Sequence, residues 1–407
     1  MTDKSILFIS PYDPEDVSKW SGTIYFLFQA LKENAEDVPV LNVRGRFAAV
    51  LDFAARALNR IVQACGISFD CRFSTAYALI SGAYFTIKLF FAKGDTIVAV
   101  AASNYMPYVF TRKLIIYISD GTFRSVCELY PAFRAFPGWS RRQGERNEAR
   151  SLSRARFAIY SSDWALESAQ RHYGVRREQL FSLPFGPNIQ PRLIEEYYDP
   201  KTIRSQDEIR ILFVSADWQR KNGELVVEIC QSLIAVGAKV RLITIGDTPA
   251  HADRLGFVDN RGFLDKSDRS ELLEICEAYQ QAHFFVLPTK ADTFGVVFSE
   301  AQAFGVPSVT YDVGGTSAAV VHGKTGILLP VGSEAAEFSE CILRYIENPD
   351  LYHELSSCCR ERYRTEANWQ SWSALILALA ERLRRGHSSD SESDNFRTLT
   401  DRIGLSQ

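Results

Sequence analysis

The run IRILFV at residues 209–214 starts a second cycle of strands and helices in this chain, and that restart decides the fold. A helical segment follows it, and then another apolar run, VRLITI at residues 240–245. Short apolar runs that alternate with helical segments are typical of parallel sheets covered by helices. Because the polar residues 203–207 separate this cycle from an earlier one, we expect two domains of the same kind.

The earlier cycle has the same alternation. It begins with ILFIS at residues 6–10, and Ser21-Gly22-Thr23 then opens a helix. The other strand-like runs lie at residues 96–101, 113–118, 157–160 and 180–183 in the first cycle and at 284–287 and 308–311 in the second. We therefore expect an α/β fold with two Rossmann-like, doubly wound domains facing a central cleft.

The length of 407 residues exceeds the roughly 250–300 residues that one hydrophobic core supports. The pattern predicts an N-terminal domain at residues 1–195 and a C-terminal domain at 196–367. A helix at 368–385 is long enough to cross back to the first domain. The tail, 386–407, has few apolar residues, and we expect it to be disordered.

Charge is distributed unevenly along the chain. The net charge of -3 and the pI near 6.1 argue against nucleic acid as a partner. From Arg44 to Arg156, however, the chain has 17 Lys and Arg against 7 Asp and Glu. This basic part suits an anionic lipid surface or an acidic acceptor.

Residues 46–62 place apolar side chains on one broad helical face flanked by arginines. Core packing is the commoner explanation of such a face. An interfacial membrane helix is the alternative, because aromatic residues gather nearby at 130–139. No run reaches the roughly 20 residues that cross a bilayer, and no signal peptide or C-x-x-C spacing is evident. We expect a cytoplasmic protein, with peripheral contact at the inner face of an anionic membrane as the alternative.

The segment PTKADTFGVVFSEAQAFGVP at residues 288–307 carries two carboxylates across a strand–loop–helix junction. Asp292 falls in the loop beside the backbone amides of Phe294 and Gly295, and Glu300 falls in the helix. Two acids placed in this way can hold two parts of an extended polar ligand, while amides at a helix start bind hydroxyl or phosphate oxygens. For an isolated pair, a solvated loop acid and a surface glutamate would be the commoner explanation.

This segment resembles the acidic signature of retaining glycosyltransferase family four, which has the GT-B fold. Further stretches agree with the resemblance: SSDWA at 161–165, YGV at 173–175, PFG at 184–186, GG at 314–315 and HGKTG at 322–326. The resemblance implies transfer of a hexose, with retention of configuration, from a nucleotide-diphosphate sugar to a glycan, lipid or small-molecule acceptor. The donor would lie mainly on the C-terminal domain and the acceptor mainly on the N-terminal domain.

The resemblance also implies roles for individual residues. Glu300 would hold the ribose hydroxyls of the donor. Asp292, together with Thr293, Phe294 and Gly295, would hold the sugar hydroxyls. The family usually has a glutamate where this chain has Asp292, so the donor sugar stays open.

Arg220 and Lys221 follow the strand at 209–214, and two cations there would clamp the diphosphate and stabilise leaving-group charge. The family's usual arginine at the strand end is replaced here by Ala216, so we assign that role to Arg220. A basic helix entrance that faces solvent is the alternative.

In the first domain, Ser21 and Gly22 open a helix near the expected acceptor and diphosphate, although a plain helix cap is the alternative. Asp120 follows the strand at 115–118 and should face the cleft in a catalytic position. Many relatives have a histidine near this position, and a turn-forming Asp-Gly is a competing explanation.

Several motifs are missing from the sequence. The six histidines have no ligand spacing, and no Asp-x-Asp occurs, so we expect no metal. No G-x-G-x-x-G follows either first strand, which argues against a dinucleotide dehydrogenase. We expect no cofactor beyond the donor substrate. The alternatives are a GT-B sugar-nucleotide epimerase or phosphorylase, or a scaffold that binds nucleotide sugars or membranes without catalysis.

Overall fold

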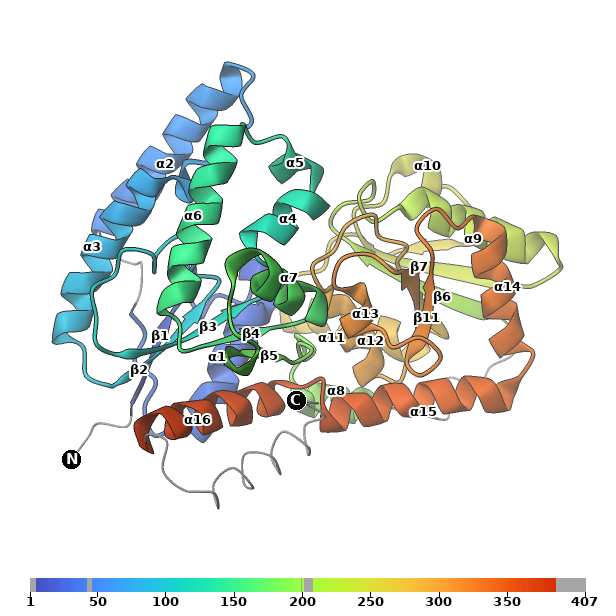
Figure 1. Cartoon of the computed structure of the whole chain (residues 1–407). Helices are drawn as coiled ribbons and strands as arrows, with labels where there is room; N and C mark the ends of the chain where they lie inside the picture. The colour runs from blue at the N-terminus through green and yellow to red at the C-terminus, as the bar shows by residue number, and fades with distance from the viewer. Residues whose placement is uncertain (1–4, 42–45, 199, 201–207, 386–407) are drawn as a thin grey trace. The chain divides into compact units, whose positions relative to one another are not determined.

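The computed structural model describes residues 5–41, 46–198, 200 and 208–385 (Figure 1). Within these residues the chain forms two compact units. Unit 1 comprises the residues up to Leu183 together with the last helix, and unit 2 is Pro184–Asn368. Each unit is built on its own parallel sheet, which confirms the predicted α/β class with two Rossmann-like domains. The predicted tail at 386–407 and the polar separator at 203–207 lie outside the described residues.

The sheet of unit 1 has parallel strands in the order β1-β2-β3-β4-β5. On the far side of β1, the Phe8 amide donates to the Pro39 carbonyl at 3.0 Å and the Leu41 amide donates to the Phe8 carbonyl at 2.9 Å. The segment at residues 39–41 thus pairs with one edge of β1, and β2, which comes later in the chain, pairs with the other edge. This arrangement makes the β1/β2 boundary a topological switch point. The strands are β1 (Ile6–Ile9), β2 (Thr96–Val100), β3 (Leu114–Ser119), β4 (Phe157–Tyr160) and β5 (Leu180–Ser182).

Alternate residues of these strands point to opposite faces of the sheet. Leu7, Ile97 and Ile115 share one face and pack in one cluster with Phe85 of α3 (Thr75–Phe91) and Leu152 of α6 (Gly138–Arg154). The helical segments of this part of unit 1 are η1 (Lys19–Gly22), α1 (Thr23–Asn34), α2 (Arg46–Ala64), η2 (Cys71–Phe73), α3 (Thr75–Phe91), α4 (Phe123–Leu129), α5 (Pro131–Arg134), α6 (Gly138–Arg154), α7 (Asp163–Tyr173) and η3 (Arg177–Gln179).

Helix α16 (Trp369–Arg385) groups with unit 1. It packs against α1 and β3 (Figure 1). Trp372, Leu375 and Leu379 are fully buried. The Arg384 guanidinium reaches both carboxylate oxygens of Asp95, at 3.0 Å each, directly before β2.

Unit 2 has a six-stranded sheet in the order β11-β10-β9-β6-β7-β8. The first strand of the unit, β6, lies between β7 and β9, so the strand order reverses at the β6/β9 boundary. The strands are β6 (Ile209–Ser215), β7 (Val240–Gly246), β8 (Val258–Asn260), β9 (Phe284–Val286), β10 (Ser308–Tyr311) and β11 (Gly326–Leu329). The helices are α8 (Pro191–Tyr197), α9 (Gly223–Ala235), α10 (Ala250–Asp253), α11 (Arg269–Gln281), α12 (Val296–Ala303), α13 (Thr316–Ala319), α14 (Ala335–Ile346) and α15 (Pro349–Thr365).

The apolar face predicted for residues 46–62 is only partly buried. Leu51 and Val62 pack against the core of unit 1. Val50 and Ile61 are exposed to 65% and 64%, and Leu58 is exposed as well. The core-packing explanation is therefore wrong for most of this face. The aromatic segment at 130–139, in contrast, turns partly inward, because Phe136 is buried in a small cluster with Phe123.

Candidate functional site

The site in unit 2 is formed where two loops leave neighbouring parallel strands. One loop connects β6 to α9, and the other connects β9 to α12. The Lys290 amide donates to the Arg220 carbonyl at 2.9 Å, which joins the loops directly. Since the β6/β9 boundary is the switch point of this sheet, these loops lie where open α/β sheets bind ligands.

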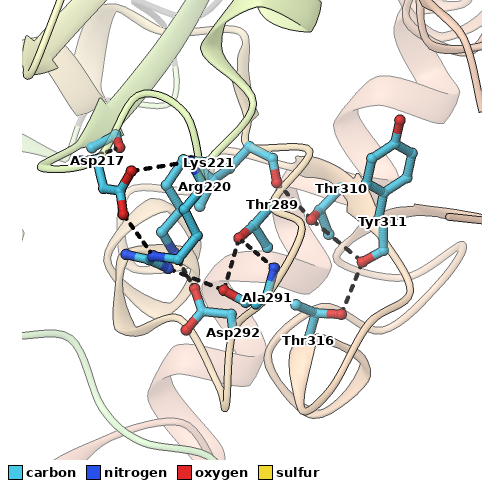
Figure 2. A network of polar contacts seen from close by, with 11 residues as sticks. Asp217, Arg220, Lys221, Thr289, Ala291, Asp292, Thr310, Tyr311 and Thr316 are labelled. Carbon is cyan, nitrogen blue, oxygen red and sulfur yellow. Dashed lines mark hydrogen bonds and ion pairs between the residues drawn. The ribbon is translucent and has the colours of Figure 1, made fainter. Parts of the chain in front are cut away.

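Lys221 and Asp292 form an ion pair at the centre of the site (Figure 2). Both residues are buried, at 8% exposure each. Burial lowers the pKa of the Lys221 ammonium, and the neighbouring Asp292 carboxylate opposes that effect. Removing either partner would leave an uncompensated charge inside the protein, which typically costs 3–5 kcal/mol. The pair therefore keeps one cation and one anion in place in a largely dry position.

Arg220 lies at the edge of the same site. Its Nε donates to an Asp217 carboxylate oxygen at 3.1 Å, and its Nη1 donates to the Ala291 carbonyl at 3.0 Å. About one third of its side chain is exposed, at 32%. The Arg220 backbone amide also donates to Asp217, and this hydrogen bond is the main reason why the pKa of the Asp217 carboxyl is lowered. Arg220 is thus oriented by both loops and still reaches solvent.

In the turn after Asp292, the backbone of Gly295 lies close to the side chains of Phe298 and Asp292. Gly295 has φ of 84° and precedes the first residue of α12, and no side chain caps that helix start. A Cβ at Gly295 would lie 2.7 Å from the Phe298 ring and 3.1 Å from a carboxylate oxygen of Asp292. Only glycine fits this turn without strain. Phe294 and Thr293 are buried at 2% and 7%.

Threonine hydroxyl groups hydrogen-bond to backbone carbonyls of the loop between β9 and α12. Thr289 Oγ1 donates to the Ala291 carbonyl at 3.1 Å, and Thr310 Oγ1 donates to the Leu287 carbonyl at 2.7 Å (Figure 2). On the other side, the Gly315 amide donates to the Asp292 carbonyl at 3.1 Å. Because the backbone carbonyls are bonded, the loop holds Asp292 in a defined position.

Glu300 is completely buried in α12, and its carboxylate has two partners. Lys266 forms an ion pair with it, and the Tyr279 hydroxyl donates to Oε2 at 3.0 Å. Burial, reinforced by the Glu300 charge, raises the pKa of the Tyr279 hydroxyl. The sequence predicted Glu300 but missed Lys266 and Tyr279. Lys266 lies in the loop between β8 and α11.

The three predicted residues of the first domain lie in unit 1. Ser21 and Gly22 have φ of 56° and 90°, directly before α1. Gly22, not Ser21, is the N-cap residue, and no side chain caps this helix. Asp120 lies beyond the carboxyl end of β3 and lines a cavity in unit 1. The structure therefore brings together Arg220, Lys221, Asp292, Thr293, Phe294 and Gly295 in unit 2, with Glu300 in the adjoining helix.

The arrangement in unit 2 combines two cations, the backbone amides of a helix start and two carboxylates. Two cations, Arg220 and Lys221, suit a pyrophosphate. The uncapped start of α12 supplies backbone amides, and Asp292 and Glu300 supply carboxylate acceptors for hydroxyl groups. Among the described residues, no group of three or more His, Cys, Asp and Glu is arranged to hold a metal ion.

Comparisons with known proteins relate this unit to glycosyltransferases. Residues 195–362 match the family model of the glycosyl transferases group 1. A D-inositol 3-phosphate glycosyltransferase of Gordonia bronchialis is 28% identical over 200 residues, covering 45% of this chain and 42% of that protein. An alpha-D-kanosaminyltransferase of Streptomyces kanamyceticus is 21% identical over 222 residues, covering 51% of this chain and 56% of that protein. The chain thus spans about half the length of these curated relatives.

Solved structures cover nearly the whole chain. A glycosyltransferase from Rickettsia africae superposes with a TM-score of 0.65 at 12% identity, covering 95% of this chain and 100% of that one. The sucrose-phosphate synthase of Thermosynechococcus elongatus gives 0.64 at 18% identity, covering 94% and 99%. The chain therefore has the GT-B fold, and its C-terminal unit carries the segment typical of glycosyl transferases group 1.

Proposed function

We propose that the protein is a glycosyltransferase that moves a hexose from a nucleotide-diphosphate sugar to a hydroxylated acceptor. The observation that carries this proposal is the buried pairing of Lys221 with Asp292 at the switch point of unit 2. The match of residues 195–362 to the glycosyl transferases group 1 supports it.

The ion pairs suggest how the donor enters. When a diphosphate binds, Lys221 exchanges the Asp292 carboxylate for a phosphate oxygen, and Asp292 becomes available to accept hydrogen bonds from the sugar. When the ribose binds, its hydroxyl groups donate hydrogen bonds to the Glu300 carboxylate in place of the Lys266 ammonium. Each buried charge keeps an opposite charge or a hydrogen bond throughout, so neither step leaves a charge isolated.

The proposed reaction retains the anomeric configuration and needs no metal. The bond between the anomeric carbon and the diphosphate oxygen breaks, and the acceptor oxygen forms its bond on the same face. A phosphate oxygen of the leaving group takes the acceptor proton. Arg220, Lys221 and the start of α12 meet the charge that develops on the diphosphate.

Binding of the donor can be tested by thermal shift with uridine, guanosine and adenosine diphosphate sugars. A ligand at a hundredfold excess over its Kd adds about 2.7 kcal/mol to the free energy of unfolding. Glu300→Gln keeps the shape of the side chain but removes its charge, so it should reduce the shift. Glu340→Gln, on the exposed side of α14, is the matched control. If none of these compounds stabilises the wild-type protein, the proposal is wrong.

The chemistry has its own test. Incubation of a binding donor with candidate acceptors should give a glycoside whose anomeric configuration, read by NMR, matches that of the donor. Release of free nucleotide without any acceptor would instead favour the epimerase, and binding without turnover would favour the scaffold. D-inositol 3-phosphate belongs in the acceptor panel, because the names of several relatives contain it.

We also propose that unit 1 makes peripheral contact with anionic membrane at the cytoplasmic face. Helix α3 has a single charged residue, Lys88, among its 17 residues, and it is apolar on both faces. Its inner face is buried, whereas Ile87, Phe90 and Phe91 are exposed to 63%, 83% and 78%. Phe110 is exposed to 80% and is tied to this helix by a hydrogen bond from its amide to Thr86 Oγ1.

The apolar side chains have cations beside them in the chain, at Lys88, Lys93 and Arg112, which suits anionic lipid headgroups. No helix among the described residues has the length and apolarity to cross a membrane. Wild-type protein should sediment with anionic vesicles more than with neutral ones at low salt. The double variant Phe90→Ser/Phe91→Ser should lose this excess. Phe263→Ser, at a 70% exposed site of unit 2, should keep it. Equal sedimentation with both vesicle types by the wild type would contradict the proposal.

A further inference from the structure

Unit 1 contains a cavity of about 310 Å³ that the donor site does not use. Tyr12 follows β1, Asn104 follows β2 and Asp120 follows β3, and all three line it. The cavity therefore lies at the carboxyl edge of the sheet, beside the β1/β2 switch point described above. Its volume is at the lower end for small-molecule sites, which favours one ring-sized group over an extended chain.

Backbone strain is concentrated in the walls of this cavity. Trp20 and Ala101 have φ of 49° and 48°, in the left-handed region that non-glycine residues rarely occupy. A conformation of this kind costs on the order of 1–3 kcal/mol and persists only where the surrounding structure imposes it. Strained residues from two separate segments, one in η1 and one directly after β2, therefore point to a ligand site.

The lining combines aromatic rings with hydrogen-bonding groups. Tyr12, Trp20 and Tyr105 contribute rings, against which the C–H faces of a saturated ring can pack. Asn104 and Glu148 contribute polar groups for hydroxyls. Glu148 is buried at 2% exposure, and it accepts a hydrogen bond from the Tyr117 hydroxyl at 3.1 Å. A ring with apolar faces and a rim of hydroxyl groups fits such a lining.

The charges of the cavity disfavour an anion. Among its described lining residues, Arg72 is the one cation, and it forms an ion pair with Asp70. The Arg72 Nε lies 3.0 Å from each carboxylate oxygen of Asp70. Burial would raise the pKa of Asp70, but hydrogen bonds from Arg72 and Asn59 outweigh it and lower that pKa. A further carboxyl group, that of Asp120, lines the same space.

We propose that this cavity binds the acceptor as an unphosphorylated sugar or cyclitol ring, neutral or amino-substituted, and discriminates against phosphorylated rings. This inference rests on the proposed transferase function and specifies its acceptor. The discrimination depends on Asp70, because Asp70 neutralises the cation that a phosphate would otherwise use.

Asp70→Asn tests that dependence with little disturbance of the fold. The Asn59 side-chain amide and the Arg72 backbone amide both donate to Oδ1 of Asp70, which an asparagine oxygen can replace. Only the guanidinium of Arg72 contacts Oδ2. The substitution should therefore preserve the cap of η2 and release the Arg72 side chain. Asp37→Asn, at an exposed position of unit 1, removes the same charge elsewhere and is the matched control.

Binding to the full chain would be measured by calorimetry or saturation-transfer NMR. The probes are two matched pairs, myo-inositol with D-inositol 3-phosphate and glucosamine with glucosamine 6-phosphate. In the wild type and in Asp37→Asn, the phosphorylated member of a pair should bind at least tenfold more weakly. In Asp70→Asn, the ratio of the Kd of the phosphorylated member to the Kd of the unphosphorylated member should fall by tenfold or more.

Three outcomes would overturn the inference: tighter or equal binding of the phosphorylated members by the wild type, an unchanged ratio in Asp70→Asn, or no binding of any probe. Nucleotide-sugar binding, which Glu300→Gln should weaken, is recorded on the same samples. If the donor binds and the acceptor result is negative, only the acceptor assignment fails. If the donor does not bind either, the transferase function itself fails.

Discussion

Glu148 on α6 is a buried carboxyl group whose replacement should change how the stability of unit 1 depends on pH. Burial is the largest influence and raises its pKa from the usual 4.5 to about 7, against the opposing effect of hydrogen bonds from Tyr117 and Ser103. Native unit 1 therefore holds this proton to a higher pH than the unfolded chain does. The stabilisation that protonation gives is fully present below pH 4.5 and is lost as the pH rises through about 7.

The size of the effect follows from the two pKa values. One pKa unit corresponds to 1.36 kcal/mol, so a rise from 4.5 to about 7 corresponds to about 3 kcal/mol between the protonated and ionised limits. Glu148→Gln cannot ionise, and its amide oxygen can still accept the Tyr117 hydroxyl. The variant should therefore gain about 3 kcal/mol relative to the wild type between pH 4.5 and pH 8.

Because the chain has two units, a single unfolding midpoint would mix their transitions. Hydrogen exchange read by mass spectrometry on peptides from β3 and α6 reports the opening free energy of unit 1 alone. Glu145→Gln, whose side chain is 35% exposed on the same helix, controls for the loss of one carboxylate. If the free-energy difference between the two variants stays constant from pH 4.5 to pH 8, our account of Glu148 is wrong.

Three further outcomes are expected. Lys221→Ala should slow transfer by roughly 100-fold or more in single-turnover assays, because it removes a cation from the leaving diphosphate. A variant that turns over at the wild-type rate would show that Lys221 does not stabilise this charge. Gly295→Ala should destabilise unit 2 by about 1–3 kcal/mol, read as the opening free energy from hydrogen exchange on peptides of β9 and α12, since its Cβ would approach the Phe298 ring at 2.7 Å, and an unchanged opening free energy would contradict the strained turn. Cys65, which is exposed, should be alkylated by iodoacetamide before the buried Cys359, whose pKa burial raises; mass spectrometry of digests would reveal any reversal.

The sequence predicts the sheets well because their strands are continuous apolar runs. The strands β4 and β10 fall where the runs at 157–160 and 308–311 indicate, and most of the others agree within a residue or two. The strands β8 (Val258–Asn260) and β11 (Gly326–Leu329) were missed. The first is three residues long and includes Asp and Asn, so its composition carries no strand signal.

The site is predictable only where its residues follow one another in the chain. The loop from Asp292 to Gly295 and the pair Arg220 and Lys221 are local motifs. Lys266 and Tyr279, in contrast, reach Glu300 only because tertiary packing brings α11 and its preceding loop against α12. No spacing in the sequence encodes such a contact.

Glu148 and α3 illustrate the same limit for unit 1. The segment GWSRRQGERNEARSLSR around Glu148 has the composition of a solvated helix, yet this one carboxyl group turns into the core beside Tyr117. Helix α3 has an apolar composition that suggests full burial, and the structure leaves Phe90 and Phe91 exposed. In both cases the neighbouring elements, and not the local pattern, decide the environment.

The position of α16 in unit 1 makes unit 2 an insertion within another folding unit. A polypeptide that stops at Leu183 lacks the helix that packs against α1 and β3 and buries Trp372. Such a fragment should aggregate when expressed alone, and a synthetic peptide spanning Trp369–Arg385 should rescue it in trans. Residues 184–368 contain all the strands of their own sheet and should be obtainable as an independent fragment.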